Sequence, residues 1–387
     1  MTPARQPRLD PLGALLSAAG AAALIFLPFV VFKTNRIVPG DPRTLLEVLP
    51  TSLSVACLSL LTLTALAALW VANARVRLLA ALLGVIVVAF AVATAANALT
   101  PPGNKVVRVA AGGAFWVLLV CVGLLATDAI TRLRPGPALR VLFLALFFAV
   151  AGLALAHGTF DHLSVMREYA VNAGRFAHEL RQHVWLALGS LLAAVIVALP
   201  IGIVCHRLPR LRAGILGTLN VIQTIPAIAL VGILMAPLGA LAAAVPWLAQ
   251  LGIRGIGAAP AVVALFLYSL LPIVANTVVG LKRVSYTAVD AARGMGMTNT
   301  QVLVSIELIL ALPVILTGIR VVLVQNIGMV TVAALIGGGG LGTFVFQGIG
   351  QTAIDLVLLG AIPIVALAFT AAVLLDALVE ALDRVRP

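Results

Sequence analysis

Continuous apolar runs of about twenty residues, separated by short polar segments, follow one another along the whole chain. A helix needs roughly 20 mostly apolar residues to cross the hydrocarbon core of a bilayer. The runs are continuous rather than alternating, which favours membrane-spanning helices over the strands of a barrel. We therefore predict an all-α integral membrane protein of about ten transmembrane helices, with spans at 11–32, 51–73, 78–98, 107–128, 138–157, 182–205, 215–239, 258–281, 308–327 and 352–377.

Composition agrees with this prediction and narrows the class of protein. Of the 387 residues, 62% are hydrophobic and 10% are charged, whereas a soluble domain carries about 25% charged residues. The net charge of +12 comes mainly from basic residues in short loops, so we expect a bilayer and no nucleic acid as partner. The cysteines Cys57, Cys121 and Cys205 lie in or beside apolar runs without metal-ligand spacing, so we expect neither metal nor cofactor.

The basic residues also predict the orientation of the chain. Short cytoplasmic loops carry an excess of Lys and Arg, and here basic clusters recur on alternate sides of successive spans. This pattern predicts that both termini are cytoplasmic and that the loop at 33–50 is external. The basic clusters are Arg5/Arg8, Arg75/Arg77, Arg132/Arg134/Arg140, Arg207/Arg210/Arg212, Lys282/Arg283/Arg293 and Arg384/Arg386.

Prolines divide the chain into two halves. Spans two to five contain no internal proline, whereas each predicted span from the sixth onward contains at least one. Proline removes a backbone hydrogen bond and kinks a helix, which a membrane bundle tolerates beside other helices or a cavity. We predict an N-terminal membrane region of about five helices at 1–157, an external amphipathic connector at 158–181, and a kinked bundle at 182–387.

A polar, glycine-punctuated segment interrupts the second half at 285–307. Asp290 lies near the start of a predicted short helix, Gly294 and Gly296 permit a tight turn, and Thr298 stands three residues before Gln301. That last spacing is typical of a capping box at the start of a helix. The segment therefore predicts a helix, a turn and a second helix that enters the membrane, all on the cytoplasmic side.

The same segment resembles the coupling loop of ABC-importer permeases. The family pattern is an acid and two alanines, then three intervening residues and a glycine, then nine intervening residues and an isoleucine. This chain matches it, although the acid is aspartate and Ile309 stands where the family has proline. The resemblance implies a coupling helix that docks on a cytoplasmic ATPase. The residues that it assigns to this role are Asp290, Ala291, Ala292, Arg293, Gly294, Gly296 and Ile306.

Flanking motifs over residues 160–387 narrow this resemblance. The segments at 183–186, 200–203, 223–230 and 333–342 look like those of osmoprotectant permeases, which carry glycine betaine, choline and similar quaternary amines. The N-terminal half is similar to that of a longer subgroup. The resemblance implies a MetI-like five-helix core, separate ATP-binding subunits, a separate substrate-binding protein, and a second permease subunit that is a copy or a homologue.

Polar residues inside predicted spans are candidates for a substrate pathway, because buried polar groups are costly in lipid and usually face the bundle interior. Hydrogen bonding between helices is the alternative for each of them. The candidates are Gln223, Thr224, Pro226, Gln325 and Asn326.

A glycine-rich segment follows the ninth predicted span, near the external side. It lacks the Lys-Ser/Thr of a phosphate-binding loop, so we predict close backbone approach or a re-entrant bend, with a flexible loop as the alternative. The glycines concerned are Gly337, Gly338, Gly339, Gly340 and Gly342.

These observations together predict a permease subunit in the inner (plasma) membrane, not an enzyme, importing glycine betaine or a related osmoprotectant. ATP would be hydrolysed elsewhere, since no Walker motif occurs. An importer for another small solute, such as an amino acid, is the alternative within the same class. An ion-coupled secondary transporter is a different class, and it would need acidic or unwound polar segments at mid-membrane; Asp355 and Asp376 lie near span ends.

Overall fold

The computed structural model describes residues 9–35, 38–104 and 106–384 and divides the chain into two compact units. Unit 1 comprises Met1–Gly136 with Ala145–Val171, and unit 2 comprises Pro137–Leu144 with Asn172–Pro387. Arg5, Arg8 and Arg386, which contribute to the predicted orientation, lie outside the described residues.

The prediction of an all-α membrane protein is confirmed. Among the residues that the structure describes, nine helices are long and apolar enough to cross a membrane. A further apolar helix at the start of the chain, α1 (Pro11–Phe26), has 16 residues. The predicted first span at 11–32 is therefore too long, because the chain leaves the helix after Phe26 and becomes extended.

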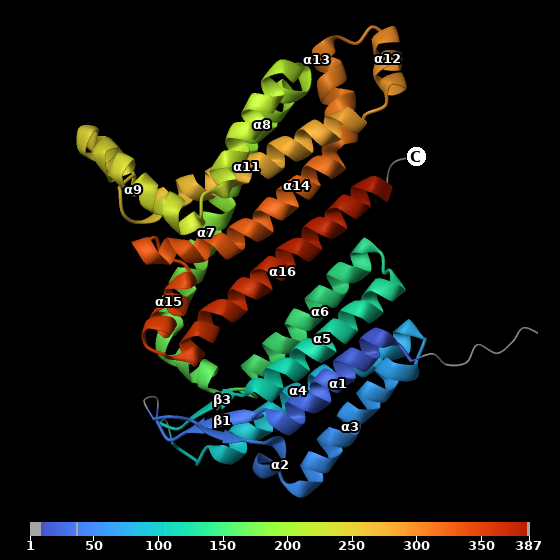
Figure 1. The fold of residues 1–387 in the computed structure, drawn as a ribbon, viewed down its shortest axis with the longest axis vertical. Helices are drawn as coiled ribbons and strands as arrows, with labels where there is room; N and C mark the ends of the chain where they lie inside the picture. Colours follow the sequence, from blue (N-terminus) through green and yellow to red (C-terminus); the bar gives the residue numbers. More distant parts are fainter. Residues whose placement is uncertain (1–8, 36–37, 105, 385–387) are drawn as a thin grey trace, which may run out of the picture. The chain divides into compact units, whose positions relative to one another are not determined.

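Unit 1 contains a helical bundle and a small sheet (Figure 1). Its elements are α1, β1 (Val30–Lys33), β2 (Asp41–Arg43), α2 (Leu45–Val48), α3 (Thr51–Trp70), α4 (Ala74–Leu99), β3 (Arg108–Ala111), α5 (Gly113–Leu133) and the greater part of α6 (Pro137–Ala156). The strand order is β2-β1-β3, and both pairings are antiparallel. Segments paired in one sheet lie on the same side of a membrane, so an even number of crossings must separate β2 from β3. The two helices α3 and α4 supply them.

A buried group of charges fastens the ends of three helices in unit 1, which are α1, α4 and α5. The Arg77 guanidinium, 1% exposed, lies 3.2 Å from a carboxylate oxygen of Asp10 and 2.9 Å from one of Asp128. Arg132 pairs with the same two carboxylates. Burial disfavours the charged form of Asp10, but the Gly13 amide and the two arginines outweigh it and hold the pKa of this carboxyl below its ordinary value.

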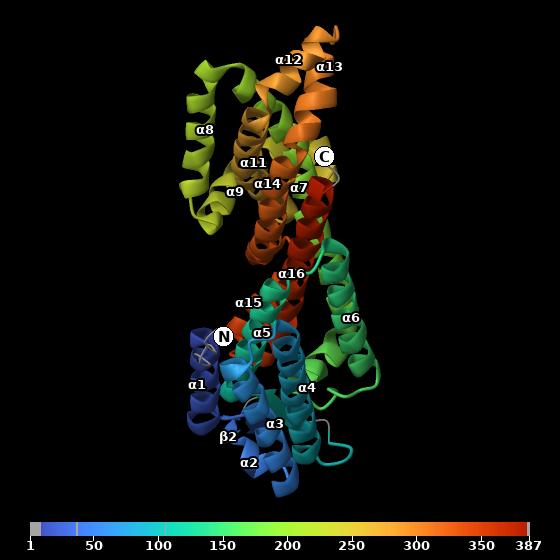
Figure 2. The same ribbon diagram turned by 90° about the vertical axis from the view of Figure 1, so that its right-hand side faces the viewer.

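Unit 2 is built on four long helices. Its elements are the first turns of α6, the greater part of α7 (Ser164–Arg207), α8 (Pro209–Thr224), α9 (Ala227–Ala244), α10 (Pro246–Gln250), α11 (Ala258–Arg283), α12 (Tyr286–Gly294), α13 (Asn299–Val302), the π-helical turn η1 (Leu303–Glu307), α14 (Leu308–Met329), the 3-10 segment η2 (Val330–Ile336), α15 (Gly342–Gly350) and α16 (Ile354–Arg384). The core lies where α11 packs against α14 and α14 against α16. Figure 2 shows α12 and α13 at one end of this unit.

The helix α7 is longer than a membrane span. Its 44 residues at 1.5 Å each extend about 66 Å, roughly twice the hydrocarbon thickness of about 30 Å. It passes residue 181 without a break, so the predicted connector and the span after it are parts of one helix. The domain boundaries at 157 and 181 stay a prediction.

The single span predicted at 215–239 is wrong. Helix α8 ends at Thr224 and α9 begins at Ala227, because Ile225 and Pro226 have extended backbones, with ψ of 127° and 139°. Proline at the first position of the new segment cannot donate the hydrogen bond that would continue α8. The apolar run hides this break, since its hydropathy continues across both helices.

Candidate functional site

The predicted coupling loop begins with the short helix α12, whose exposed residues include Asp290 and Ala291 of the acid–alanine motif. The Ser285 side chain accepts a hydrogen bond from the Ala288 amide at 3.2 Å and so caps the helix. Ala292 is buried, 1% exposed, whereas Asp290 and Ala291 are exposed. One alanine therefore packs the helix onto the protein while its neighbours stay available to a partner.

The turn after α12 is fixed by backbone hydrogen bonds. The Met297 amide donates to the Ala292 carbonyl at 3.2 Å, and the Gly296 amide donates to the Arg293 carbonyl at 2.9 Å. This pair of bonds is the Schellman arrangement, which needs a left-handed residue just past the helix end. Gly296 fills that position with φ +82°, whereas Gly294 is the last helical residue. The predicted helix–turn–helix is confirmed, and only one of its two glycines needs positive φ.

The second arm of the loop is a continuous rod that enters the bundle. Thr298 and Gln301 form the predicted capping box, with bonds of 2.7 and 3.3 Å. From Asn299 the chain stays helical through α13, η1 and α14 to Met329. Ile306 lies half-buried in the π-helical turn η1. Ile309, where the related family has proline, is helical, and Pro313 follows one turn later inside α14.

An ion pair fastens this rod to α7. Glu307 is 4% exposed, and its carboxylate oxygen lies 2.6 Å from the Arg207 guanidinium at the end of α7. Its burial and this ion pair make Glu307 an anchor for the predicted coupling loop.

Of the pathway candidates, Gln223, Thr224 and Pro226 lie at the break between α8 and α9. The Gln223 side-chain amide donates to the Tyr268 carbonyl of α11 at 2.7 Å. The Tyr268 hydroxyl in turn donates to the Ile225 carbonyl. Thr224 and Pro226 are exposed. Hydrogen bonds to Tyr268 thus hold the break against α11, whereas Thr224 and Pro226 remain exposed.

The other two candidates, Gln325 and Asn326, lie near the end of α14. Asn326 is fully buried, and its amide nitrogen donates to the hydroxyls of Ser190 on α7 and Ser269 on α11, at 3.1 and 3.0 Å. Asn326 therefore joins three helices in this conformation. Gln325 is half-buried and contacts the sulfur of Met329 at 3.4 Å. Pathway roles for both residues stay a prediction.

The glycine-rich segment bends back onto α7. Gly337, Gly339 and Gly340 have φ of +76°, +74° and +87°. The Gly340 amide donates to a carboxylate oxygen of the buried Glu179 at 2.6 Å, and the Gln182 side chain donates to the Gly338 carbonyl at 3.3 Å. Two side chains of α7 therefore hold the glycine-rich segment against that helix.

His183 completes this attachment with both ring nitrogens. Its Nε2 lies 2.9 Å from the Ile327 carbonyl, which only accepts, so Nε2 carries the proton. Its Nδ1 therefore accepts from the Leu341 amide at 3.3 Å. The fully buried ring is thus a neutral bridge between α7, α14 and the glycine-rich segment.

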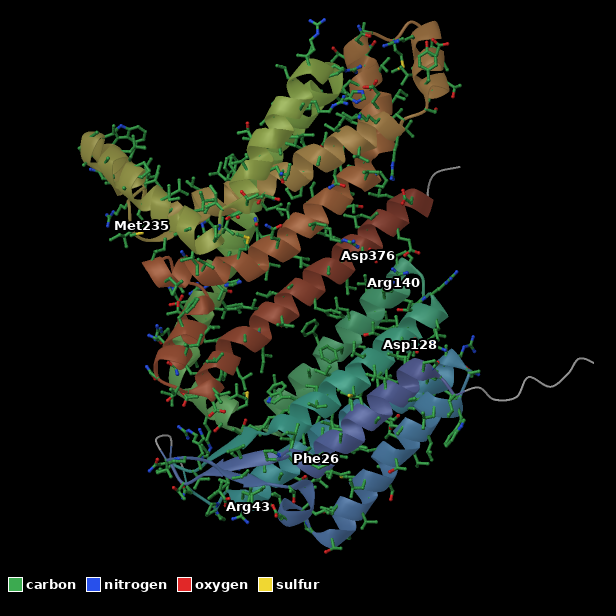
Figure 3. The ribbon with its side chains drawn as sticks, viewed as in Figure 1. Phe26, Arg43, Asp128, Arg140, Met235 and Asp376 are labelled. Carbon is green, nitrogen blue, oxygen red and sulfur yellow. The ribbon has the colours of Figure 1, made fainter. Side chains whose placement is uncertain are left out.

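Several anchoring residues were missed by the sequence reasoning. Glu179 and His183 hold the glycine-rich segment, and Arg320, inside α14, pairs with Asp376 of α16. Arg140, in the first turns of α6 that belong to unit 2, reaches the same aspartate at 3.0 Å (Figure 3). A lone arginine inside an apolar run is the signal that would have located Arg320, because such a charge requires a partner.

Two family descriptions match the chain. Residues 190–385 match the "Binding-protein-dependent transport system inner membrane component" family. Residues 10–166 match the "ABC transporter permease YehY, N-terminal domain" family.

Curated relatives match the second half. The osmoprotectant import permease OsmW of Salmonella typhimurium is 42% identical over 197 residues, which is 51% of this chain and 86% of that protein. The carnitine transport permease OpuCB of Listeria monocytogenes is 39% identical, over 48% of this chain and 78% of that protein. The choline permease OpuBB of Bacillus subtilis is 36% identical, over 51% and 83%.

Among solved structures, the methionine ABC transporter MetNI in an inward-facing conformation is similar, with a TM-score of 0.45 and 19% identity. The similarity covers 54% of this chain and 95% of that chain.

Proposed function

Since the chain belongs to the family of binding-protein-dependent transport system inner membrane components, we propose that it is the permease subunit of an ATP-driven importer for glycine betaine or another quaternary amine. One observation carries this proposal. A short helix with an exposed small-residue side, α12, is rigidly joined to core helices in a chain whose relatives are osmoprotectant, carnitine and choline permeases.

The arrangement of the loop suits the transmission of force. A partner that moves α12 also displaces the Schellman turn, because two backbone hydrogen bonds hold that turn to the end of the helix. The continuous rod from Asn299 to Met329 then carries the displacement into the core, and the pair Arg207–Glu307 shares it with α7. A ligand shifts a conformational equilibrium only through its different affinities for the two states, so closure of an ATPase must act at this loop.

The partners follow from this role. The proposal includes ATP-binding subunits on the cytoplasmic side, a substrate-binding protein on the external side, and a second permease subunit in the inner membrane. The loop at 285–307 and both termini would lie in the cytoplasm, as the basic clusters indicate.

A matched pair of variants tests the coupling role. A Cβ added at Gly294 or Gly296 meets no atom within 4 Å, so neither position is sterically closed. A left-handed backbone costs a branched residue about 1–2 kcal/mol, and only Gly296 has that backbone. We expect Gly296→Val to lower ATP-driven uptake of glycine betaine or choline about tenfold, because 1.4 kcal/mol corresponds to a factor of ten.

The comparison variant, Gly294→Val, adds the same bulk to the coupling loop at a right-handed helical position, so uptake should fall less than in Gly296→Val. Both variants are reconstituted with the ATPase subunits and the binding protein, and capture of the ATPase is measured beside uptake. Equal uptake and equal capture by the two variants would reject a coupling role for the turn. Absence of quaternary-amine uptake by the wild-type assembly would reject the proposed substrate class.

A further inference from the structure

A crevice lies between α1 and α3 in unit 1. The two helices meet at one end, where the Asp10 amide donates to the Leu69 carbonyl at 3.1 Å and a Cβ added to Gly13 would collide with the Ala68 carbonyl oxygen. Beyond this contact the helices leave a cavity of about 130 Å³. Its floor is formed by buried residues of α5, which are Leu118, Cys121, Val122 and Leu125.

The crevice is elongated along the helix axes. Its walls lie within residues 16–24 of α1 and 58–68 of α3, which extend about 12 and 15 Å at 1.5 Å per residue. Ala21 and Thr62 on its rim are exposed, so it opens to the side of the unit. An apolar cavity of about 150 Å³ stays dry and binds benzene, so this one has room for about six carbons of a hydrocarbon chain.

One hydroxyl in the crevice wall has no partner. The hydroxyls of Thr62 and Thr64, on the opposite wall, donate to carbonyls four residues earlier in α3, at 2.7 and 3.0 Å. Ser17 on α1 makes no such bond, and within the described residues its buried oxygen has no hydrogen-bond partner. A buried donor without an acceptor is costly, so we expect an occupant of the crevice to supply one.

Ser17 lies close to the depth at which lipid ester groups lie. Seven residues, or about 10 Å along the axis of α1, separate it from Asp10. Asp10 belongs to the charged group around Arg77, and charged groups of membrane helices lie at the interface. The headgroup region on each side of the hydrocarbon core is about 5–7 Å thick, which places Ser17 a few ångströms inside the core boundary. The ester carbonyls of glycerolipids lie at that boundary.

The same end of unit 1 is positively charged at its surface. Arg75 lies in the first turn of α4 and Arg134 directly follows α5, and both side chains are exposed. Arginines at the membrane surface attract phosphate and anionic headgroups. Apolar length, an unpaired donor near ester depth and exposed arginines at the headgroup level are the features of one kind of molecule, a glycerophospholipid.

We propose that the α1–α3 crevice binds one acyl chain of a glycerophospholipid from the predicted cytoplasmic leaflet. The ester carbonyl of that chain accepts a hydrogen bond from Ser17, and the phosphate lies toward Arg75 and Arg134. This lipid site belongs to unit 1 alone, so it goes beyond the proposed function and does not depend on it.

A photoactivatable lipid tests the site. The probe is phosphatidylglycerol with a diazirine about six carbons along one chain, made both as the diester and as the diether, which lacks the carbonyl. Each is added in trace amount to nanodiscs of phosphatidylethanolamine and phosphatidylglycerol that hold the full chain, and labelled peptides are located by mass spectrometry. We expect the diester to label α1 and α3 about fivefold more than the diether, which is the factor that one neutral hydrogen bond supplies.

Two variants, each with a matched control, locate the binding. Ser17→Ala should lower labelling by the diester to the level of the diether, whereas Ser59→Ala, at an exposed serine of α3 outside the crevice, should keep the difference. Ala65→Phe fills the crevice and should remove labelling by both lipids, whereas Ala56→Phe, at an exposed alanine of α3, should not. Thermal unfolding reports whether each variant folds, and the Ser17→Ala comparison decides if Ala65→Phe does not.

Other results overturn the proposal. Equal labelling of the wild type by the diester and the diether would exclude the ester contact and would leave Ser17 to a water molecule. Labelling that survives Ala65→Phe would show that lipid touches only the outer surface of the helices. Absence of labelling would show that another protein surface covers the crevice. Uptake enters none of these measurements, so failure of the proposed function would leave their outcome unchanged.

Discussion

At the scale of single residues, burial decides what a charged side chain does. Glu307 sits in the π-helical turn at the mouth of α14 with 4% of its surface exposed, and Arg207 is its partner at 2.6 Å. A buried carboxylate that loses its partner pays its desolvation cost without compensation. The pair therefore fixes where the rod of the coupling loop meets α7.

Neutralising one member of the Arg207–Glu307 pair should lower the free energy of unfolding more than neutralising both members. We expect Arg207→Gln to lower the free energy of unfolding by about 1–3 kcal/mol, because it leaves the Glu307 carboxylate buried and unpaired. The double variant with Glu307→Gln should recover part of that loss. Thermal unfolding in detergent of the wild type, of Arg207→Gln, of Glu307→Gln and of the double variant gives the coupling energy. Strictly additive effects would show that the pair does not stabilise the fold.

At the scale of elements, glycines decide how closely segments approach. The glycine-rich segment passes between η2 and α15 and is held to α7 through Glu179 and His183. A Cβ at Gly342 would lie 2.3 Å from the Thr331 carbonyl oxygen, which no heavy atom tolerates. The backbone of α15 therefore approaches η2 more closely than any side chain permits.

A pair of alanine variants on α15 measures this approach. Overpacking a closed site costs about 1–3 kcal/mol, so Gly342→Ala should lower the free energy of unfolding by that amount. Gly350→Ala, at the other end of the same nine-residue helix, meets nothing within 4 Å and serves as the control. Thermal unfolding of both purified variants compares them, and similar midpoints would contradict the close approach.

The same scale shows where sequence reasoning failed. The helical spans were predicted from continuous apolar runs. Such a run does not reveal a helix break at which the residues stay apolar, as at Ile225 and Pro226. The three-stranded sheet of unit 1 was not predicted, because β1 and β3 are separated by more than seventy residues. Pairing of that kind depends on which distant segments the helices bring together.

At the scale of the whole molecule, the direction of the chain through the bilayer decides which surfaces meet which partners. Within unit 2, α11 separates the loop before it from the coupling loop after it. Its 26 residues extend about 39 Å, which exceeds the hydrocarbon thickness of about 30 Å. Leu251 and Met295, 69% and 75% exposed, therefore lie on opposite sides of the membrane if α11 crosses it.

Cysteine labelling in sealed, right-side-out vesicles tests this direction. A membrane-impermeant thiol reagent should modify Leu251→Cys from outside and should modify Met295→Cys only after the vesicles are opened. The wild-type chain, whose three cysteines are buried, provides the background. The reverse pattern would invert the predicted orientation and would move the predicted coupling loop away from the cytoplasmic ATPase.

The sequence by itself determined the class of protein, the number and order of most helices, and the helix–turn–helix at 285–307. These features depend on local signals, which are apolar run length, capping residues and a glycine at a left-handed position. Tertiary structure alone decided that Glu307 binds Arg207, that Asn326 joins three helices, and that Glu179 and His183 hold the glycine-rich segment. Those contacts join residues about 60 to 160 positions apart in the sequence. In lipid a polar group needs a partner within the protein, and only the packing of the helices determines which polar side chains meet.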